Sequence, residues 1–137
     1  MTNVDAAAAV LALLGADTNL TVYDTVVPVD PTTGVPPLRP YVVVYAPVGK
    51  STLNNLTGNS GALEALIQTT CVGDTAESCR IVSRRVKADL LDIRPVIVGR
   101  VSFPIRHADS RPPQVDNQVQ PPVLFAVDRW LTSSVPA

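Results

Sequence analysis

The tripeptide Gly49-Lys50-Ser51 comes nearest, by residue type, to a known chemistry, that of phosphate binding. It follows the apolar run 41–46 and resembles the end of a P-loop, in which backbone amides and a lysine hold nucleotide phosphates. The full pattern also requires a glycine at the position of Val44 and a helix directly afterwards. Residues 54–58 contain two asparagines and a glycine, which disfavour that helix. The sequence therefore predicts a turn with an exposed Lys50.

The other candidates for chemistry are the single histidine, His107, and the aspartates near it. His107 and Asp109 could activate a serine nucleophile, but no G-x-S-x-G segment presents one, so we expect a surface histidine. Asp109 and Asp116 lie in a polar segment and are too few for a metal site. The spacing of Cys71 and Cys79 matches no zinc or redox signature and indicates buried reduced thiols. The sequence thus predicts neither an enzyme, nor a cofactor, nor a metal ion.

The charges are few and are unevenly distributed along the 137 residues, a length that predicts one domain over 1–137. Charged residues make up 17% of the chain, below the usual value of about 25%. Residues 80–111 hold eight of the eleven basic residues and carry a net charge of +5, while the rest carries −6. Such separation suits head-to-tail pairing between copies, which can close into a ring. The alternative is a solvated face of one helix and one strand.

The first half of the chain is predicted to form one helix and three strands. A helix over residues 3–14 has an apolar stripe, with Thr2 or Asn3 as its cap and Gly15 closing it in a left-handed conformation. A short strand, 20–24, precedes a proline-rich loop, 26–40. The apolar run 41–46 is typical of a central strand buried on both faces. After a polar loop, 47–62, alternation over 63–72 predicts a strand whose odd-numbered residues face the core.

The second half is predicted to form a helix and two strands. Asp74 with Glu77 indicates a capping box, and the helix buries one face, Cys79, Val82, Val86 and Leu90. Arg94-Pro95 ends this helix. A strand over 96–106, with Ile97, Val101, Phe103 and Ile105 on one face, leads to a third loop, 107–122, and a last strand, 123–131.

The predicted order, α-β-β-β-α-β-β, indicates an α+β fold: a single mixed or antiparallel sheet of about five strands with two helices packed on one face. Three connecting loops of about 15 residues are long for such a domain. Ordering them costs about 1–2 kcal/mol per residue, which suggests stabilisation by a neighbouring subunit. The apolar run 6–14 is too short to span a membrane, and Asp5 argues against a signal peptide. We therefore expect a protein made and kept in the cytoplasm, with no membrane partner.

A series of motifs along nearly the whole chain resembles one family. Leu-Leu-Gly at 13–15 leads into LTVYD at 20–24, and a proline-rich stretch leads into PYVVVY at 40–45. QTTCVG at 68–73 precedes a helix rich in Arg and Val, and the chain continues to PPVLFAVDRW at 121–130. This series resembles the tail terminator proteins of long-tailed phages (siphophages) that infect actinobacteria.

The resemblance implies a virion protein, made in the host cytoplasm, that forms a hexameric ring on the tail tube. Such a ring ends polymerisation of the major tail tube protein and joins the tail to the head connector, and genomic DNA passes through it without sequence-specific binding. The family has no catalytic residues to carry over. From the loops, the basic segment and the one tryptophan, we predict contacts with other subunits or partners at Pro36, Arg39, Lys50, Asn54, Arg84, Arg85, Arg111 and Trp130.

Three alternatives remain open at this point. Another neck component, such as a head-completion or stopper protein, shares the small size and the lack of catalytic motifs. A small cytoplasmic binding module or enzyme would depend on Gly49-Lys50-Ser51 alone. A DNA-binding protein would depend on the basic segment 80–111 and predicts an affinity for DNA that falls strongly with salt.

Overall fold

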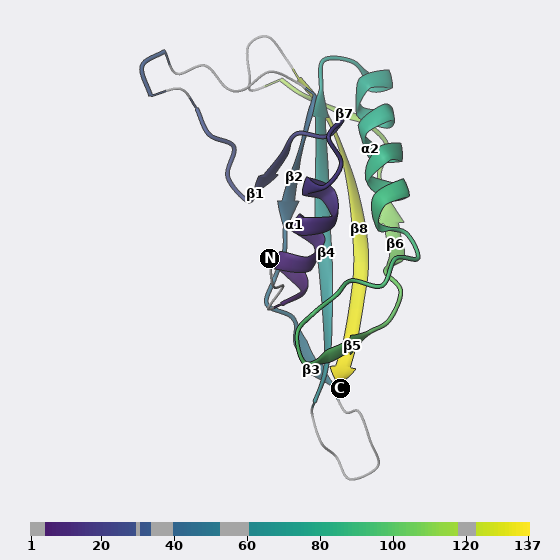
Figure 1. Cartoon of the computed structure of the whole chain (residues 1–137). Coiled ribbons are helices and arrows are strands. Elements are labelled where there is room, and N and C mark those ends of the chain that lie inside the picture. The colour runs from purple at the N-terminus through teal and green to yellow at the C-terminus, as the bar shows by residue number, and fades with distance from the viewer. Residues whose placement is uncertain (1–4, 30, 34–39, 53–60, 118–122) are drawn as a thin grey trace.

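Two long strands, β4 (Ala62–Gly73) and β8 (Val123–Pro136), form the centre of an eight-stranded sheet (Figure 1). The computed structural model describes residues 5–29, 31–33, 40–52, 61–117 and 123–137. β4 and β8 run antiparallel in continuous register, from Leu63 opposite Ser134 to Gly73 opposite Leu124. The α2 helix and three strands separate them in sequence, so the sheet's main ladder is a long-range contact.

The remaining strands are short and pair with these two or with each other. The sheet order is β1-β2-β4-β8-β5, with β3 also paired to β4 and with β6 and β7 also paired to β8. Only β1 and β2 run parallel; every other pair is antiparallel. The α+β class is confirmed, but the sheet has eight strands instead of about five. The short strands are β1 (Val22–Asp24), β2 (Tyr41–Tyr45), β3 (Lys50–Thr52), β5 (Arg100–Ser102), β6 (Arg106–Ser110) and β7 (Gln114–Asp116).

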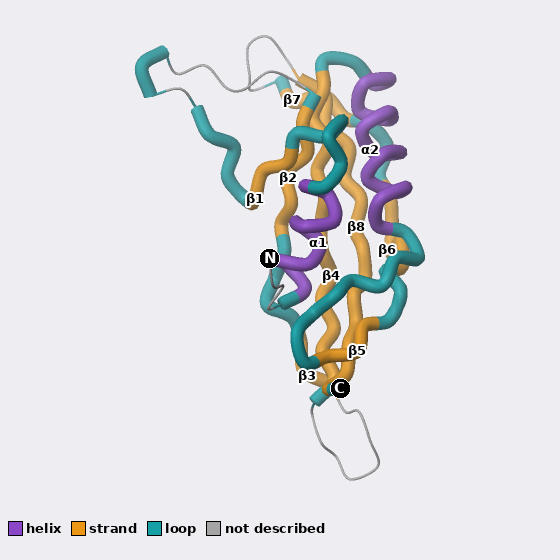
Figure 2. Tube along the Cα trace, viewed as in Figure 1, coloured by secondary structure: helices purple, strands orange, loops and turns teal. Residues whose placement is uncertain are grey.

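Both helices, α1 (Ala6–Gly15) and α2 (Ala76–Leu90), pack on the same face of the sheet, as Figure 2 shows. Their apolar residues join one core with the side chains of β2, β4 and β8 that point toward them. Removing apolar surface from water contributes about 1.5–3 kcal/mol for each such side chain. Neither described helix is long and apolar enough to cross a membrane. The core includes Val10, Leu14, Val42, Val44, Ile67, Cys71, Val82, Val86, Leu90, Ile105 and Trp130.

The helix starts differ from the predicted ones. Asp5 caps α1 by accepting a hydrogen bond from Ala8 N at 2.8 Å; Thr2 and Asn3 lie outside the described residues. Gly15 is the last residue of α1, and its φ is not among the positive values, so the predicted left-handed closure is wrong. Thr75, one residue after Asp74, caps α2 by accepting from Ser78 N at 3.0 Å. The predicted D-x-x-E capping box is therefore wrong.

A glycine is required where β4 turns into α2. A Cβ added at Gly73 would lie 3.0 Å from the Cβ of Ser78 and 3.3 Å from the backbone N of Cys79. The absence of a side chain at Gly73 thus lets the first turn of α2 pack directly on the end of β4. As predicted, Cys79, Val82, Val86 and Leu90 form the buried face of the helix that follows.

The segment after α2 departs most from its prediction. The helix ends at Leu90, four residues before Arg94-Pro95, and the predicted strand 96–106 is replaced by a loop and two short strands, β5 and β6. Ile97 and Ile105 are buried as predicted, but Val101 is 49% exposed and Phe103 is 45% exposed. In β5 it is Ser102, not Val101, that is buried, and the chain leaves the sheet between Ser102 and Arg106, so the predicted alternation fails.

Two of the three predicted loops contain strands. Lys50–Thr52 of the predicted loop 47–62 form β3, and the predicted loop 107–122 contains most of β6 and all of β7. Residues 25–29 and 31–33 have no helix or strand, as predicted for the proline-rich loop. Residues 53–60, 118–122 and the remaining part of that loop lie outside the described residues. The last strand continues beyond Leu131 to Pro136.

Candidate functional site

A pocket of about 460 Å³ lies between α2 and the turn that follows β6. Three basic side chains reach it from α2, where Arg80, Arg84 and Lys87 lie three to four residues apart and therefore share one face of the helix. Arg111 approaches from the turn after β6. All four of these residues are exposed. The pocket therefore gathers positive charge from two elements, and it includes two of the predicted contact residues, Arg84 and Arg111.

The floor of this pocket contains a buried carboxylate, that of Asp128 in β8, which is only 2% exposed. The Ser83 hydroxyl donates to Asp128 Oδ2 at 2.5 Å, and His107 Nε2 lies 3.1 Å from Asp128 Oδ1. The aspartate thus stands between the serine and the histidine. A serine nucleophile requires the histidine next to its hydroxyl, with the aspartate behind the histidine. This arrangement instead satisfies a buried charge, as buried polar groups require.

The Trp130 side chain lies directly behind this cluster. Its ring stacks on the His107 ring with centroids 4.4 Å apart, and its Nε1 donates to Thr69 Oγ1 at 3.0 Å. Trp130 is fully buried within the chain. The prediction that Trp130 contacts another subunit is therefore wrong, because the side chain is enclosed by this chain's own core. His107 is likewise not a simple surface residue and does not pair with Asp109.

A second charged group lies on another face of α2. Arg85 Nε donates to both oxygens of Asp17, at 3.1 and 2.9 Å. Hydrogen bonding from Asp89, together with Arg85, lowers the pKa of Asp17 to about 2. Burial and the neighbouring Asp17 raise the pKa of Asp89 to about 6. Arg85, a predicted contact residue, is therefore engaged in an intramolecular ion pair with Asp17, and the pKa values of Asp17 and Asp89 are shifted in opposite directions.

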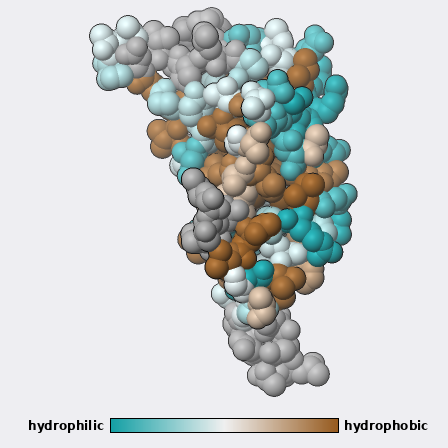
Figure 3. All heavy atoms as spheres, in the orientation of Figure 1, coloured by the Kyte–Doolittle hydropathy of each residue, from teal (hydrophilic) through white to brown (hydrophobic). Residues whose placement is uncertain are grey.

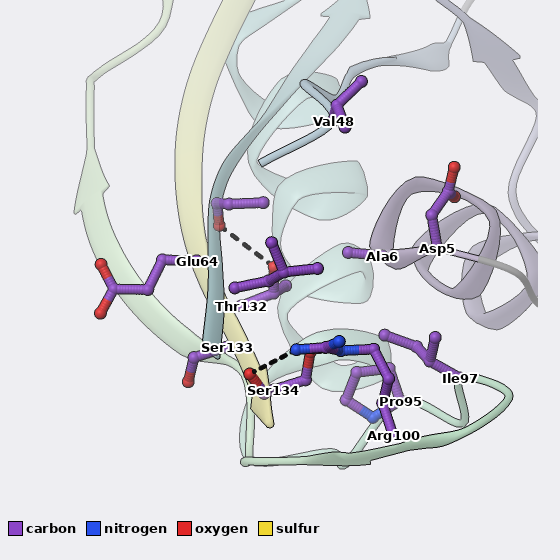
Figure 4. Close-up of a pocket in the computed structure, with 12 residues that line it drawn as sticks. Asp5, Ala6, Val48, Glu64, Pro95, Ile97, Arg100, Thr132, Ser133 and Ser134 are labelled. Carbon is purple, nitrogen blue, oxygen red and sulfur yellow. Dashed lines mark hydrogen bonds between the residues drawn. The ribbon is translucent and has the colours of Figure 1, made fainter. Parts of the chain in front are cut away.

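A smaller, mainly apolar pocket of about 250 Å³ lies at the other end of the sheet, beside the first turn of α1 (Figure 4). Arg100 closes one side, where its Nε donates to Ser134 Oγ at 2.8 Å and its Nη2 to Gly61 O at 2.5 Å. Asp5 caps α1, and Figure 4 shows the Glu64 carboxylate pointing away from the pocket. No acid–base pair among the described residues therefore faces this pocket.

The face of the sheet opposite the helices has no covering helix in the part of the chain that the structure describes. Alternate residues of the strands point to it, and several are apolar and exposed, among them Tyr45 (40%), Leu66 (42%) and Leu131 (37%). Arg129 and Asp109 form a cross-strand ion pair on the same face. The Arg129 guanidinium lowers the pKa of Asp109, and the Asp109 carboxylate raises that of Arg129.

The two outer edges of the sheet lie on opposite sides of the molecule, as Figure 1 shows for β1 and β6. Among the described strands, β1 pairs with β2 alone and β6 pairs with β8 alone. Val42 N donates to Thr21 O and Thr25 N donates to Val44 O, each at 2.9 Å. Odd-numbered residues of β1 therefore bond to β2, and the backbone N–H groups of Val22 and Asp24 point to the free edge.

The hydropathy of the surface distinguishes the two helices. In Figure 3, hydrophilic residues gather along α2, whereas hydrophobic surface lies over α1. The loop after α2 adds exposed apolar residues, with Val96 76% and Val98 59% exposed. The charged and the apolar parts of the helical layer are therefore separated.

The remaining predicted residues are not brought to either pocket. Lys50 is exposed, as predicted, but it lies in β3 opposite Glu64, and Gly49 before it has a φ of 110°, so the tripeptide begins a strand and forms neither the predicted turn nor a phosphate loop. Pro36, Arg39 and Asn54 lie outside the described residues. Cys71 and Cys79 are free and buried, as predicted, and burial raises the pKa of both thiols. The described residues contain no group of three or more potential metal ligands.

Sequence reasoning missed Ser83 and Asp128, yet a signal for Asp128 was present. Its position is even-numbered, like those of Ala126 and Trp130, which places it on the core side of the strand. A charged residue at a core position requires a hydrogen-bonding partner, so the position of Asp128 alone indicates a buried polar cluster. The partners themselves come from 45 and 21 residues away. Comparison with known proteins adds no identification: no family model matches the chain, and a search of curated proteins found no match.

Proposed function

We propose that the chain is a structural subunit of a phage tail, which joins copies of itself into a ring that caps the tail tube. The ring ends polymerisation of the tube protein and provides the joint to the head connector. The motif series described above resembles tail terminators, and this resemblance supplies the biological role. The observation that supports assembly is that, within the described residues, the sheet ends at two edges without a further strand, β1 and β6, on opposite sides.

A free edge is a template for pairing with another chain. Because the two edges differ, a contact between β1 of one copy and β6 of the next is heterologous, and repeated rotation can close it into a ring. The charges of the two sides also differ: Asp24 is exposed at the β1 edge, whereas Arg80, Arg84 and Arg111 lie beside β6. Complementary charge favours this orientation over like-to-like pairing.

The exposed apolar residues on the sheet face opposite the helices support the same proposal. When the sheets of adjacent copies pair at their edges, their faces form one continuous surface. The exposed apolar residues Tyr45, Leu66 and Leu131 of each copy lie on this surface. Apolar area of this kind is typical of a face that a partner covers. In this proposal, the tube protein or the head connector covers this surface.

The experiment is a gene deletion examined by electron microscopy of the resulting particles. Loss of a terminator gives overlong tails, and complementation restores the normal length. Leaking heads with normal tails would instead identify a head-completion or stopper protein, the second candidate. Unchanged particles would contradict both.

The edge contact is tested by Asp24→Pro with Asp24→Ala as its matched control. Both variants remove the carboxylate, but only proline removes the N–H that points to the free edge. We expect the proline variant to remain folded and to fail in ring formation, while the alanine variant retains at least part of it. Equal behaviour of the two variants would exclude backbone pairing at this edge.

A further inference from the structure

The four basic residues around the 460 Å³ pocket are not neutralised within the described part of the chain. None of Arg80, Arg84, Lys87 and Arg111 forms an ion pair with a described carboxylate. Other arginines are engaged: Arg85 with Asp17, Arg106 with Asp92, and Arg129 with Asp109. The unpaired positive charge is therefore concentrated where the surface is hollowed.

The carboxylate in the pocket floor offsets only one of these four positive charges, so the lining keeps an excess of three (4 − 1). Both oxygens of Asp128 are engaged, one by the Ser83 hydroxyl and the other by His107 Nε2. Like charges three to four residues apart on a helix repel one another. A concave, low-dielectric surface strengthens the field of such a cluster and raises the local concentration of anions. The pocket thus has the electrostatics of an anion site.

We propose that this pocket binds a phosphate group carried by a nucleotide or by a nucleic-acid backbone. A terminal phosphate has a charge between −1 and −2 near neutral pH and three acceptor oxygens, so several cations can contact it from different directions. Arginine guanidinium groups bind phosphate oxygens in pairs, and lysine adds a point charge. A single carboxylate would leave most of the four cations unpaired.

The shape of the pocket and its neutral lining fit a phosphate that is part of a larger molecule. The volume exceeds the space that one phosphate needs, and the Ser110 hydroxyl offers a neutral donor beside Arg111. Pro112 and Pro113 form an apolar part of the wall, against which a sugar can pack. The proposal does not depend on ring assembly, because every named residue belongs to one chain.

The test uses the purified full-length protein, titrated with a fluorescent DNA duplex, with ATP and with inorganic phosphate. Binding is followed by anisotropy for the duplex and by calorimetry for the small anions. The double variant Arg84→Gln with Arg111→Gln removes two cations of the pocket. Lys50→Gln with Arg106→Gln removes the same net charge from exposed positions away from it. Circular dichroism verifies that both variants are folded.

We expect the pocket variant to bind about tenfold more weakly or worse for at least one of these phosphate ligands, and the control to bind like the wild type. For the duplex, the slope of log affinity against log salt should also fall by about two. Binding of DNA alone assigns the phosphate to a nucleic-acid backbone, and binding of ATP or phosphate alone assigns it to a small molecule. Either result supports the site.

Three results would overturn the proposal. The first is no measurable binding of any phosphate ligand, and the second is an equal loss of affinity in the pocket and control variants. The third is that a poly-glutamate peptide displaces the bound phosphate ligand as efficiently as inorganic phosphate does. The last result would make the pocket a site for acidic protein segments. The phosphate site does not require ring formation, so the two proposals can fail separately. Rings without phosphate binding would contradict only the phosphate site. Phosphate binding without rings would contradict only the proposed assembly.

Discussion

The two faces of strand β8 differ in solvent exposure and in hydrogen bonding. On the helix side, Asp128, Trp130 and Thr132 are each no more than 3% exposed, and each has a hydrogen-bond partner. On the opposite side, Leu131 is 37% exposed, and Arg129 forms an ion pair with Asp109 at the surface. Alternate residues of one strand thus have opposite environments.

This difference indicates which side of the molecule maintains the fold and which is available to partners. The helix side closes a core around a buried carboxylate and the only tryptophan. The opposite side leaves apolar residues of β2, β4 and β8 partly exposed, which suits a protein that is completed by its neighbours.

Trp130→Ala should destabilise the chain by about 3–5 kcal/mol, because it opens a cavity in the core and removes the contacts with His107 and Thr69. Leu131→Ala, at the adjacent position on the other face, should cost about 1 kcal/mol or less. Urea denaturation followed by circular dichroism measures both. Similar losses in the two variants would remove the distinction between the faces.

Asp128→Ala should cost about 1–3 kcal/mol, because Ser83 Oγ and His107 Nε2 then lose their buried partner. Asp128→Asn should cost less, since an amide oxygen still accepts a hydrogen bond from the serine. The free energy of unfolding at neutral pH gives both values. If the alanine variant is as stable as the wild type, the cluster does not support the core.

The carboxyl pair beside α2 should make stability depend on pH. Asp89 has a folded pKa of about 6 against an ordinary value of 3.8, so the folded state binds its proton more tightly than the unfolded state. Its contribution is present below pH 4 and is lost as the pH rises through 6. Asp17, with a pKa of about 2, contributes above pH 4 and loses this contribution as the pH falls through 2.

The measurement for this pair is the urea midpoint between pH 4.5 and 7. We expect the urea midpoint to fall as the pH rises from 4.5 to 7, because the stabilising contribution of Asp89 is lost. Asp89→Asn should remove this part of the dependence of the midpoint on pH. Asp92→Asn, two residues after the end of α2, should keep it. A wild-type slope that Asp89→Asn leaves unchanged would show that folding does not raise the pKa of Asp89.

Arg129→Ala should have the smallest effect of these substitutions, because the ion pair with Asp109 lies on the face opposite the helices and is screened by water and salt. The loss should shrink further in high salt. A cost comparable to that of Asp128→Ala would mean that the uncovered face is as important to the monomer as the helix side. Chemical denaturation at low and high salt provides this comparison.

The sequence predicted best the elements that carry their own periodicity. The alternation of β4, the apolar run of β2 and the buried face of α2 are all confirmed. The strands β3, β6 and β7 were missed, because three to five residues show no reliable period and they are strands only through pairing with β4 or β8. Val101 and Phe103 were wrongly predicted to face the core: Val101 lies in β5 on its exposed side, and the chain leaves the sheet at Phe103.

The candidate site was predicted only in part. Charge along 80–111 pointed to Arg84 and Arg111, which line the same pocket. The charge distribution could not distinguish these two residues from Arg85. Arg85 follows Arg84 in α2 but points to another face of the helix and pairs with Asp17. The assignment of Trp130 to an interface failed because its enclosure depends on His107 and Thr69, which are brought to it by strand pairing.

Sedimentation velocity of the purified chain, alone and mixed with tail tubes, tests most directly whether it works by joining copies of itself. The account predicts a closed ring of one stoichiometry, a hexamer if the resemblance holds, formed in solution or on the tube end. Asp24→Pro should abolish the ring, and Asp24→Ala should not. A protein that stays monomeric at every concentration, and also in the presence of tubes, would contradict the account.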